Sequence, residues 1–304
     1  MKRLLTILIS VLVISNLGAQ DVNYKTLNDE PKNITNFSCN LDLCHFDGGF
    51  NQIDGWSFNL GAWGHGMLKQ RLGLDYTFRY GWLTFGKLSD KTIKPSLNIQ
   101  AGGFLIFSQN IKQSQNKIVL KTEDLGYVGG GKTATKVTYI MVPSSKWKYR
   151  ALRAGVYMKR GVYRVDDPNG PDAIGNFYML GAYGGICFGK GVKLSIQTDK
   201  YGVKGFATHT RICLDALITP IHNAPAGVTK VIPIGGRILI QTLPSVTRKE
   251  GKKKYNRRMV IEGEAGYRLA DGLYIACTIA IPITRNLAIL GKPQEDTNTK
   301  RTAE

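Results

Sequence analysis

Beyond its first twenty residues the chain has no uninterrupted run of eighteen apolar residues, which excludes a protein that crosses a membrane with helices. No amphipathic helical pattern stands out, and thirty-five glycines and fourteen tyrosines favour strands and turns. Acidic residues are also scarce, because 22 Asp and Glu stand against 41 Lys and Arg for a net charge of +19. Such an excess suits nucleic acid, anionic lipid or an anionic solute as a partner.

The first twenty residues have the three parts of a secretory signal peptide. Lys2 and Arg3 are basic, residues 4–17 are apolar, and Gly18 and Ala19 are the small residues that cleavage requires. The apolar run is shorter than the ~20 residues of a membrane-spanning helix, so we expect residues 1–20 to be removed. The residue directly after the expected cleavage site is not a cysteine, which argues against a lipid-anchored protein. Because the chain is expected to leave the cytoplasm, nucleic acid is the least suitable of the three partners, and we predict no nucleic-acid binding.

The clearest pattern in the chain is the alternation RLGLDYTFRYGW over residues 71–82. One parity is wholly apolar and the other is polar or small, so a strand here has one apolar and one polar face. Ordinary strands run about 5 or 6 residues, whereas a tilted strand that crosses a bilayer needs about 9 to 11. The twelve alternating residues therefore predict a membrane-spanning strand.

The same alternation recurs from Trp56 to Leu290 and gives eleven or twelve strand candidates. We expect short turns at residues 143–146, 189–191 and 270–272, and longer links at residues 108–132, 161–175 and 243–256. In this pattern the chain resembles the outer-membrane β-barrel proteins of Gram-negative bacteria, which have short turns on one side and long loops on the other. The resemblance implies an antiparallel transmembrane β-barrel of about 10–12 strands. The expected organisation is a signal peptide at 1–20, a polar N-terminal extension at 21–55, the barrel at 56–290 and a polar tail at 291–304.

In a closed barrel the face opposite the apolar positions points into the lumen. The charged and titratable residues with this parity are Arg71, Asp75, Arg79, Arg153, Lys159, His209, Arg211, Asp215, Glu262, Glu264 and Arg268. They form either a mixed network that plugs a narrow barrel or a basic lining that favours anions. His209 beside Asp215 invites a catalytic role, but no cluster of Ser or His supplies a nucleophile and an orienting group. We predict a structural histidine and no enzymatic activity.

A basic segment puts seven basic residues in eleven: Arg248, Lys249, Lys252, Lys253, Lys254, Arg257 and Arg258. It contacts lipopolysaccharide phosphates, captures an anionic solute or is a solvated charged loop.

Five cysteines remain to be assigned. Cys39 and Cys44 lie close together in a polar segment of an exported chain, which makes a disulfide between them plausible. Adding His45 gives three metal ligands without a fourth, so we predict no metal site. Cys187, Cys213 and Cys277 occur in strand-like runs and are interpreted as small apolar side chains.

The segment 126–133 matches the phosphate-binding P-loop pattern. A functional P-loop needs a strand before it and a helix after it, whereas residues 134–143 are β-rich and end in proline. We interpret the match as a surface loop and predict no cofactor.

The leading hypothesis is a non-enzymatic outer-membrane β-barrel that acts as a small passive pore or as a structural or accessory protein of the envelope. Its expected partners are outer-membrane lipid and lipopolysaccharide phosphates. The alternative is a soluble exported β-sandwich that binds a ligand or mediates adhesion. Apolar positions on the outer face of nearly every strand favour the barrel, since a sandwich leaves its outer faces polar.

Overall fold

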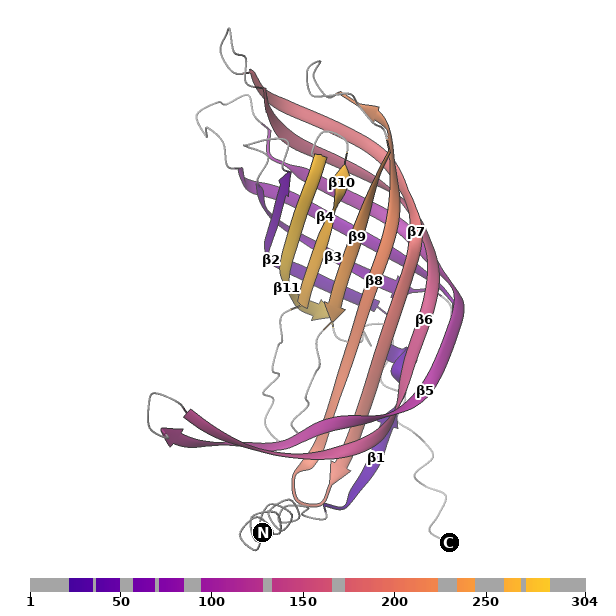
Figure 1. Cartoon of the computed structure of the whole chain (residues 1–304), viewed down its shortest axis with the longest axis vertical. Coiled ribbons are helices and arrows are strands. Elements are labelled where there is room, and N and C mark those ends of the chain that lie inside the picture. Colours follow the sequence, from indigo (N-terminus) through magenta and orange to yellow (C-terminus); the bar gives the residue numbers. More distant parts are fainter. Residues whose placement is uncertain are drawn as a thin grey trace, which may run out of the picture.

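Ten antiparallel strands, β2 to β11, close into a barrel in the computed structural model, and consecutive strands are paired (Figure 1). Pairing of β11 with β2 completes the wall. The strands are β2 (Phe37–Gly49), β3 (Ser57–Met67), β4 (Leu72–Thr84), β5 (Leu97–Tyr127), β6 (Thr133–Val165), β7 (Ala173–Thr198), β8 (Gly202–His222), β9 (Ile234–Leu243), β10 (Val260–Arg268) and β11 (Gly272–Thr284). The predicted antiparallel barrel is confirmed, and the fold is not the two-sheet sandwich of the alternative.

The structure describes residues 22–34, 37–49, 57–68, 71–84, 94–127, 133–165, 173–223, 234–243, 260–268 and 272–284. The expected signal peptide and the expected polar tail lie outside these ranges. Within them, no helix has the length and the hydropathy to cross a membrane.

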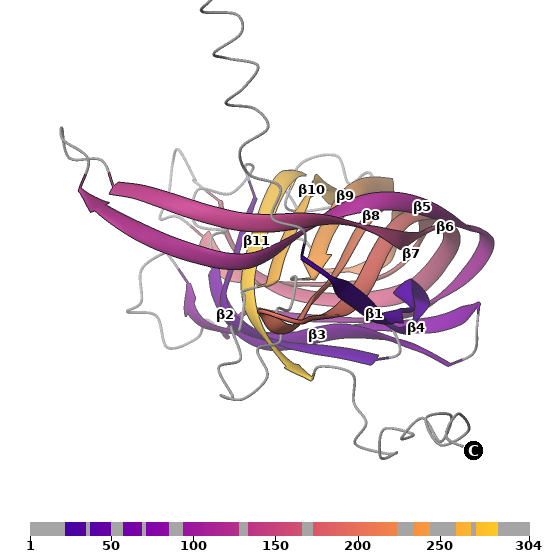
Figure 2. The ribbon, with the colours of Figure 1, turned by 90° about the horizontal axis from the view of Figure 1, so that it is seen from below.

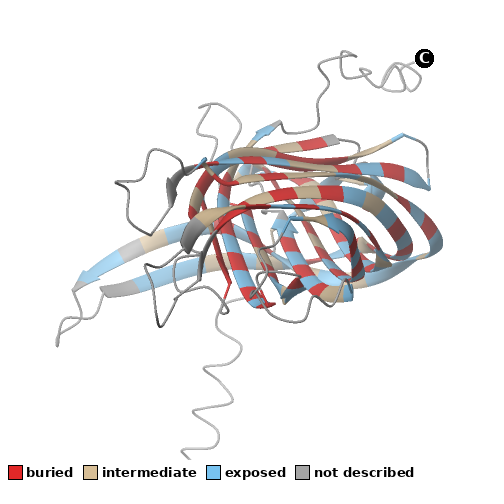
Figure 3. Cartoon of the chain, turned by 90° about the horizontal axis from the view of Figure 1, so that it is seen from above, coloured by how far each residue is buried: buried red, intermediate tan, exposed pale blue. Residues whose placement is uncertain are grey.

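Buried and exposed residues alternate along the strands of the wall (Figure 3). In β4, Asp75 and Arg79 are buried while Leu74 and Phe78 are exposed, as the alternation over residues 71–82 predicts. The reason is the two-residue period of a strand, which sends successive side chains to opposite faces. Here the apolar face is the outer one.

The barrel begins at Phe37, nineteen residues before the predicted start at Trp56, because β2 pairs with both β3 and β11. Two features of β2 hide it in the sequence. Its buried face carries polar residues such as Asp42 and His45, so the segment resembles a polar extension. Its pairing with β3 is also irregular between Leu41 and His45, where a bulge shifts the alternation by one residue.

Strands β5 to β8 continue beyond the barrel at the end where β1 lies (Figure 1). There β6 separates from β7 below the pair Lys146–Val192, and β1 (Tyr24–Asp29) takes its place along β7. The backbone N–H of Ser145, freed by this separation, donates to both carboxylate oxygens of Asp29 at 2.9 and 2.8 Å. The short 3₁₀ helix η1 (Pro31–Ile34) follows β1.

The β5–β6 hairpin then curves across the end of the β7–β8 hairpin (Figures 1 and 2). Its residues Ile118, Leu120 and Val142 pack against Leu194 and Ile196 of β7. We call this two-layered unit, made of β1 and of residues 113–127, 133–145 and 192–206, the end sandwich. The end sandwich has a small hydrophobic core of its own, outside the barrel.

Two predicted turns are wrong, since Pro143–Lys146 lies inside β6 and Gly189–Gly191 inside β7. Pro143 is tolerated because β6 has no β7 partner there, and an edge strand can lose an N–H donor. Gly189 serves packing rather than turning, because a Cβ there would come within 2.0 Å of the Tyr149 ring. The predicted link at residues 108–132 is likewise β-strand as far as Tyr127. The P-loop match spans the tip between β5 and β6, a strand–strand hairpin rather than a strand followed by a helix.

Candidate functional site

The barrel interior gathers ten of the eleven predicted lumen residues. All ten are buried: Asp75, Arg79, Arg153, Lys159, His209, Arg211, Asp215, Glu262, Glu264 and Arg268. Arg71 is the exception and is exposed, because it stands in the turn before β4 begins at Leu72. Its parity is that of the lumen face, but it lies one residue beyond the wall.

Opposite charges balance in this interior. The buried cations of the described wall are Arg79, Arg153, Lys159, Arg211, Arg237 and Arg268, and the buried carboxylates are Asp42, Asp47, Asp75, Asp215, Glu262 and Glu264. Six positive and six negative charges give a net charge of zero. Sequence reasoning missed Asp42, Asp47 and Arg237. The only other buried lysine of the described residues, Lys204, belongs to the end sandwich. We call these twelve residues, with their polar partners, the interior network.

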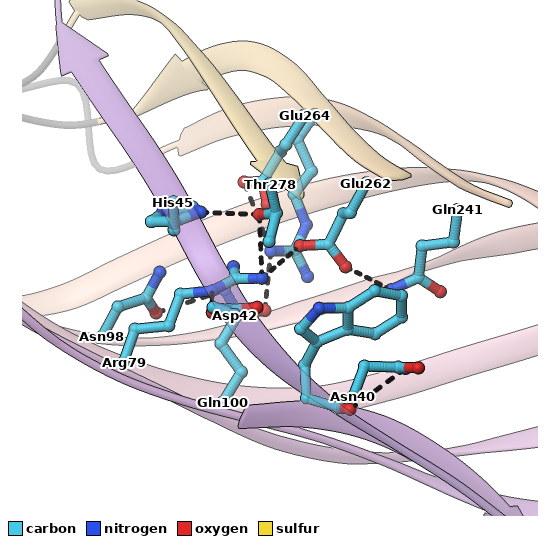
Figure 4. A network of polar contacts seen from close by, with 12 residues as sticks. Asn40, Asp42, His45, Arg79, Asn98, Gln100, Gln241, Glu262, Glu264 and Thr278 are labelled. Carbon is cyan, nitrogen blue, oxygen red and sulfur yellow. Dashed lines mark hydrogen bonds and ion pairs between the residues drawn. The ribbon is translucent and has the colours of Figure 1, made fainter. Parts of the chain in front are cut away.

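Arg79 of β4 is the centre of one part of this network (Figure 4). Its Nε donates to Asp42 Oδ2 at 2.7 Å, and its Nη2 donates to Glu262 Oε1 at 2.7 Å and to Thr278 Oγ1 at 3.1 Å. Glu262 is further held by Gln241, whose Nε2 donates to Oε2 at 2.5 Å. Because β4 and β10 are not neighbours in the wall, the Arg79–Glu262 pair joins opposite sides of the lumen.

A second part of the network also crosses the lumen, from β8 to β4. Arg211 Nη1 lies 2.7 Å from Asp75 Oδ1, and Arg211 Nε donates to Gln241 Oε1 at 2.9 Å. Gln241 thereby links Arg211 to Glu262 and joins the first two parts. The network is continuous rather than a set of separate pairs.

Arg153 and Arg237 share the carboxylate of Asp215, at 3.3 and 2.7 Å. Both guanidinium groups also lie 4.7 Å from the ring centre of Tyr183, a favourable distance for cation–π contact. Glycines make this possible, because a Cβ at Gly155 would come within 2.5 Å of the Tyr183 hydroxyl. The Tyr183 ring therefore lies over a glycine of the neighbouring strand β6 and has two arginines against it.

The third part lies around Asp47 of β2. Lys159 Nζ is 3.1 Å and Arg268 Nη2 is 2.9 Å from its two carboxylate oxygens. The Arg268 guanidinium also lies 3.3 Å from the ring centre of Tyr274, and the Tyr274 hydroxyl donates to Glu264 Oε1 at 2.5 Å.

His209 lies in an aromatic layer rather than in a charged one. It is stacked on Trp147 and Tyr149, and its Nε2 is 3.0 Å from the Tyr149 hydroxyl. A second histidine, His65, lies beside it with ring centres 5.5 Å apart, and Ser38 Oγ is 3.1 Å from His65 Nδ1. If His65 were the base that activates a nucleophile, a third group would have to orient its ring. His65 Nε2 has no hydrogen-bond partner among the described atoms.

A small polar cavity remains between these groups, with room for about one water molecule. Its lining includes Asp75, Arg79, Arg153, Arg211 and Glu262. Among the described residues, no cluster of three or more His, Cys, Asp or Glu is placed to hold a metal ion. The arrangement is one of mutually paired charges that fill the lumen.

The disulfide of the described chain joins Cys187 and Cys213 and not the predicted pair. These cysteines face each other directly in the register of β7 and β8, so their interpretation as simple apolar side chains is also wrong. Cys39 and Cys44 lie five residues apart on the single strand β2. At about 3.3 Å per residue they are about 16 Å apart, far beyond disulfide reach.

The basic segment lies outside the described residues, so its seven side chains have no structural account. Leu243 and Val260, the nearest described residues on either side, end β9 and begin β10. The segment therefore connects these two strands.

Comparison with known proteins gives no relative, since no family model, no curated protein and no solved structure matches the chain.

Proposed function

We propose that the chain is a barrel embedded in the bacterial outer membrane, closed to solutes, that acts as a structural or accessory protein of the envelope. In this proposal the barrel is an anchor whose lumen is filled, and the end sandwich is the part that projects from the membrane. The observation that carries the proposal is the distribution of polarity, apolar outside and charged inside, around the entire wall.

The outer face is apolar on each of the ten strands. One exposed residue from each, in strand order, is Leu43, Leu60, Phe78, Leu105, Val156, Ile186, Leu214, Ile238, Ile261 and Ile275. An apolar band that surrounds a protein is far larger than the patches of a few hundred Å² that soluble monomers expose. The wall also has no open edge, and hydrocarbon cannot satisfy the backbone groups of an open sheet. Lipid is the solvent that suits both features.

The interior network favours a closed barrel over a small pore. A pore that selects anions needs an excess of cations along its lining, but the six cations here face six carboxylates. The ion pairs of the interior network from β4 to β10 and from β8 to β4 cross the space that a solute would need. The charges stabilise one another instead of an ion in transit.

The test is fractionation of cells that express the full chain, followed by electrophoresis of unboiled and boiled samples. We expect the protein in the outer-membrane fraction and a change of migration on boiling. Recovery as a soluble protein would refute the membrane location.

Planar bilayers then separate the closed barrel from the pore. We expect no stepwise conductance from the purified protein, with a known porin as the positive control. Reproducible anion-selective steps would refute the closed barrel and support the basic lining.

A further inference from the structure

A cluster of four lysines lies on the outer face of the wall, where β5, β6 and β7 leave the barrel for the end sandwich. The four are Lys112 of β5, Lys146 and Lys148 of β6, and Lys190 of β7, and we call them the basic cluster. Lys112, Lys148 and Lys190 are exposed and Lys146 is half-buried. On β6 they share the parity of the exposed Leu152, which is opposite to that of the buried Tyr149. They therefore point away from the lumen.

The register places these lysines directly opposite one another. Lys112 is the partner of Lys146 across β5 and β6, and Lys148 is the partner of Lys190 across β6 and β7. Like charges opposite each other on one face of a sheet destabilise it. The four side chains converge in spite of this repulsion.

No carboxylate relieves this repulsion within the described parts of the chain. The buried cations of the interior network have ion pairs, whereas the described ion pairs include none of the four lysines. The ion pair between Lys121 and Glu123 is on the same β5–β6 hairpin but lies farther along the end sandwich. A site rich in unpaired ammonium groups is suited to an anion.

The surroundings identify an amphipathic anion. Immediately next to the cluster on the outer face come Arg150, Leu152 and Phe188, where Arg150 and Phe188 are partners in the register. Leu152 and Phe188 are 51% and 43% exposed and belong to the apolar band. A ligand here meets ammonium groups at one end and an apolar surface at the other, as the phosphate and the acyl chains of a lipid do.

We propose that the basic cluster, with Arg150 beside it, is a binding site for the phosphate groups of membrane lipids. The inference rests on the membrane location proposed above and names the residues that hold the lipid. Lys148 and Lys190 lie in one register row with Thr210 and Thr242, so β9 ends at the level of the cluster.

The experiment uses the full-length protein purified in a neutral detergent and titrated with defined lipids by native mass spectrometry. The variant K146Q/K148Q/K190Q removes three charges of the cluster. The matched control K117Q/K136Q/K200Q removes three charges from exposed lysines of the end sandwich. The ligands are phosphatidylglycerol, lipid A, phosphatidylcholine and inorganic phosphate.

We expect the wild type to bind phosphatidylglycerol or lipid A at least tenfold more tightly than phosphatidylcholine. The cluster variant should lose that preference, and the control should stay within twofold of the wild type. A loss for lipid A alone identifies lipopolysaccharide as the source of the phosphate, and a loss for phosphatidylglycerol alone identifies phospholipid.

Three outcomes would overturn the inference. The first is an equal loss of lipid affinity in both variants, which indicates an effect of net charge only. The second is a wild type that binds the anionic lipids no more tightly than phosphatidylcholine. The third is an equal affinity for inorganic phosphate, which indicates a soluble anion as the ligand. Electrophoresis of the same unboiled samples separates these from a failure of the proposed function. A wild type that changes migration on boiling but shows no lipid preference refutes the lipid site and leaves the barrel anchor intact.

Discussion

Replacement of Arg79 by methionine tests the interior network at its best-connected residue. The change keeps a long side chain but removes the ion pairs to Asp42 and Glu262 and the hydrogen bond to Thr278. The two carboxylates left behind have side chains 0% and 4% exposed, so both negative charges stay buried without a cation beside them. Removal of one partner of a buried ion pair costs about 3–5 kcal/mol. We expect the lower half of that range, because Gln241 still donates to Glu262.

A compensated variant separates charge from packing. In R79M/D42N/E262Q the two carboxylates become neutral amides, so no uncompensated charge stays in the lumen. We expect it to regain at least half of the lost free energy of unfolding, since neutral replacement of a buried charge set is often tolerated. The control R150M removes an exposed arginine from the outer face and should change the free energy by less than about 0.5 kcal/mol.

The assay is equilibrium urea unfolding of each protein in the same detergent, followed by tryptophan fluorescence. We expect R79M to lose about 3 kcal/mol of the free energy of unfolding. A value within about 0.5 kcal/mol of the wild type would refute the ion-pair geometry. A compensated variant no more stable than R79M would refute the reasoning differently, since the loss would then come from shape rather than charge.

Three further predictions concern the rest of the chain. C187S/C213S should lower the free energy of unfolding by about 3 kcal/mol, because the disulfide closes a loop of 26 residues, and alkylation before and after reduction should show these two thiols only after reduction. L214R should destabilise a lipid-embedded barrel by about 2–4 kcal/mol, whereas L125R, at an exposed leucine of β5 in the end sandwich, should change little. Equal effects in urea titrations would contradict a lipid-facing wall. D29N should weaken the contact with the freed N–H of Ser145 in β6 and speed hydrogen exchange in β1, while exchange in the barrel stays unchanged. Uniform acceleration would contradict a separate end sandwich.

The barrel and most of its lumen residues could be predicted because both depend on a local property, the two-residue period. Asp215 and Arg211 are assigned to the interior by their parity with respect to Ile212 and Leu214, and both side chains are buried in the structure. The same signal was present for Arg237, which alternates with Ile238 and Ile240 in the short strand β9. To predict Arg237 as a lumen residue, the inner and outer faces must be assigned in every strand, including short ones such as β9.

The ion-pair partners could not be predicted, because they depend on strand number and stagger around the whole barrel. Nothing local relates Arg79 to Glu262, which are 183 residues apart. The β2 strand was missed for a different reason, since its bulge breaks the period on which the prediction depends. Period and closure are separate kinds of information, and the sequence pattern contains only the first.

The disulfide shows how one misplaced turn carries through to a site. Cys187 and Cys213 each lie thirteen residues from Lys200, so a hairpin centred there must place them opposite each other. Both also have the parity of the lumen face. The turn was instead predicted at Gly189–Gly191, where glycine makes room for the Tyr149 ring. With that turn, the two cysteines are on unrelated parts of the wall.

The distribution of charge decides where the function of this chain should be sought. Its net charge of +19 suggests at first a lumen that attracts anions. The described interior contributes six positive and six negative charges, so none of the excess lies there. The excess belongs to the outer surface and to the segments beyond the wall, among them the basic cluster and the basic segment between β9 and β10. Because charges outside the lumen act on what surrounds the barrel rather than on what passes through it, this distribution supports the proposed anchoring of the barrel among anionic lipids over the proposal of a pore.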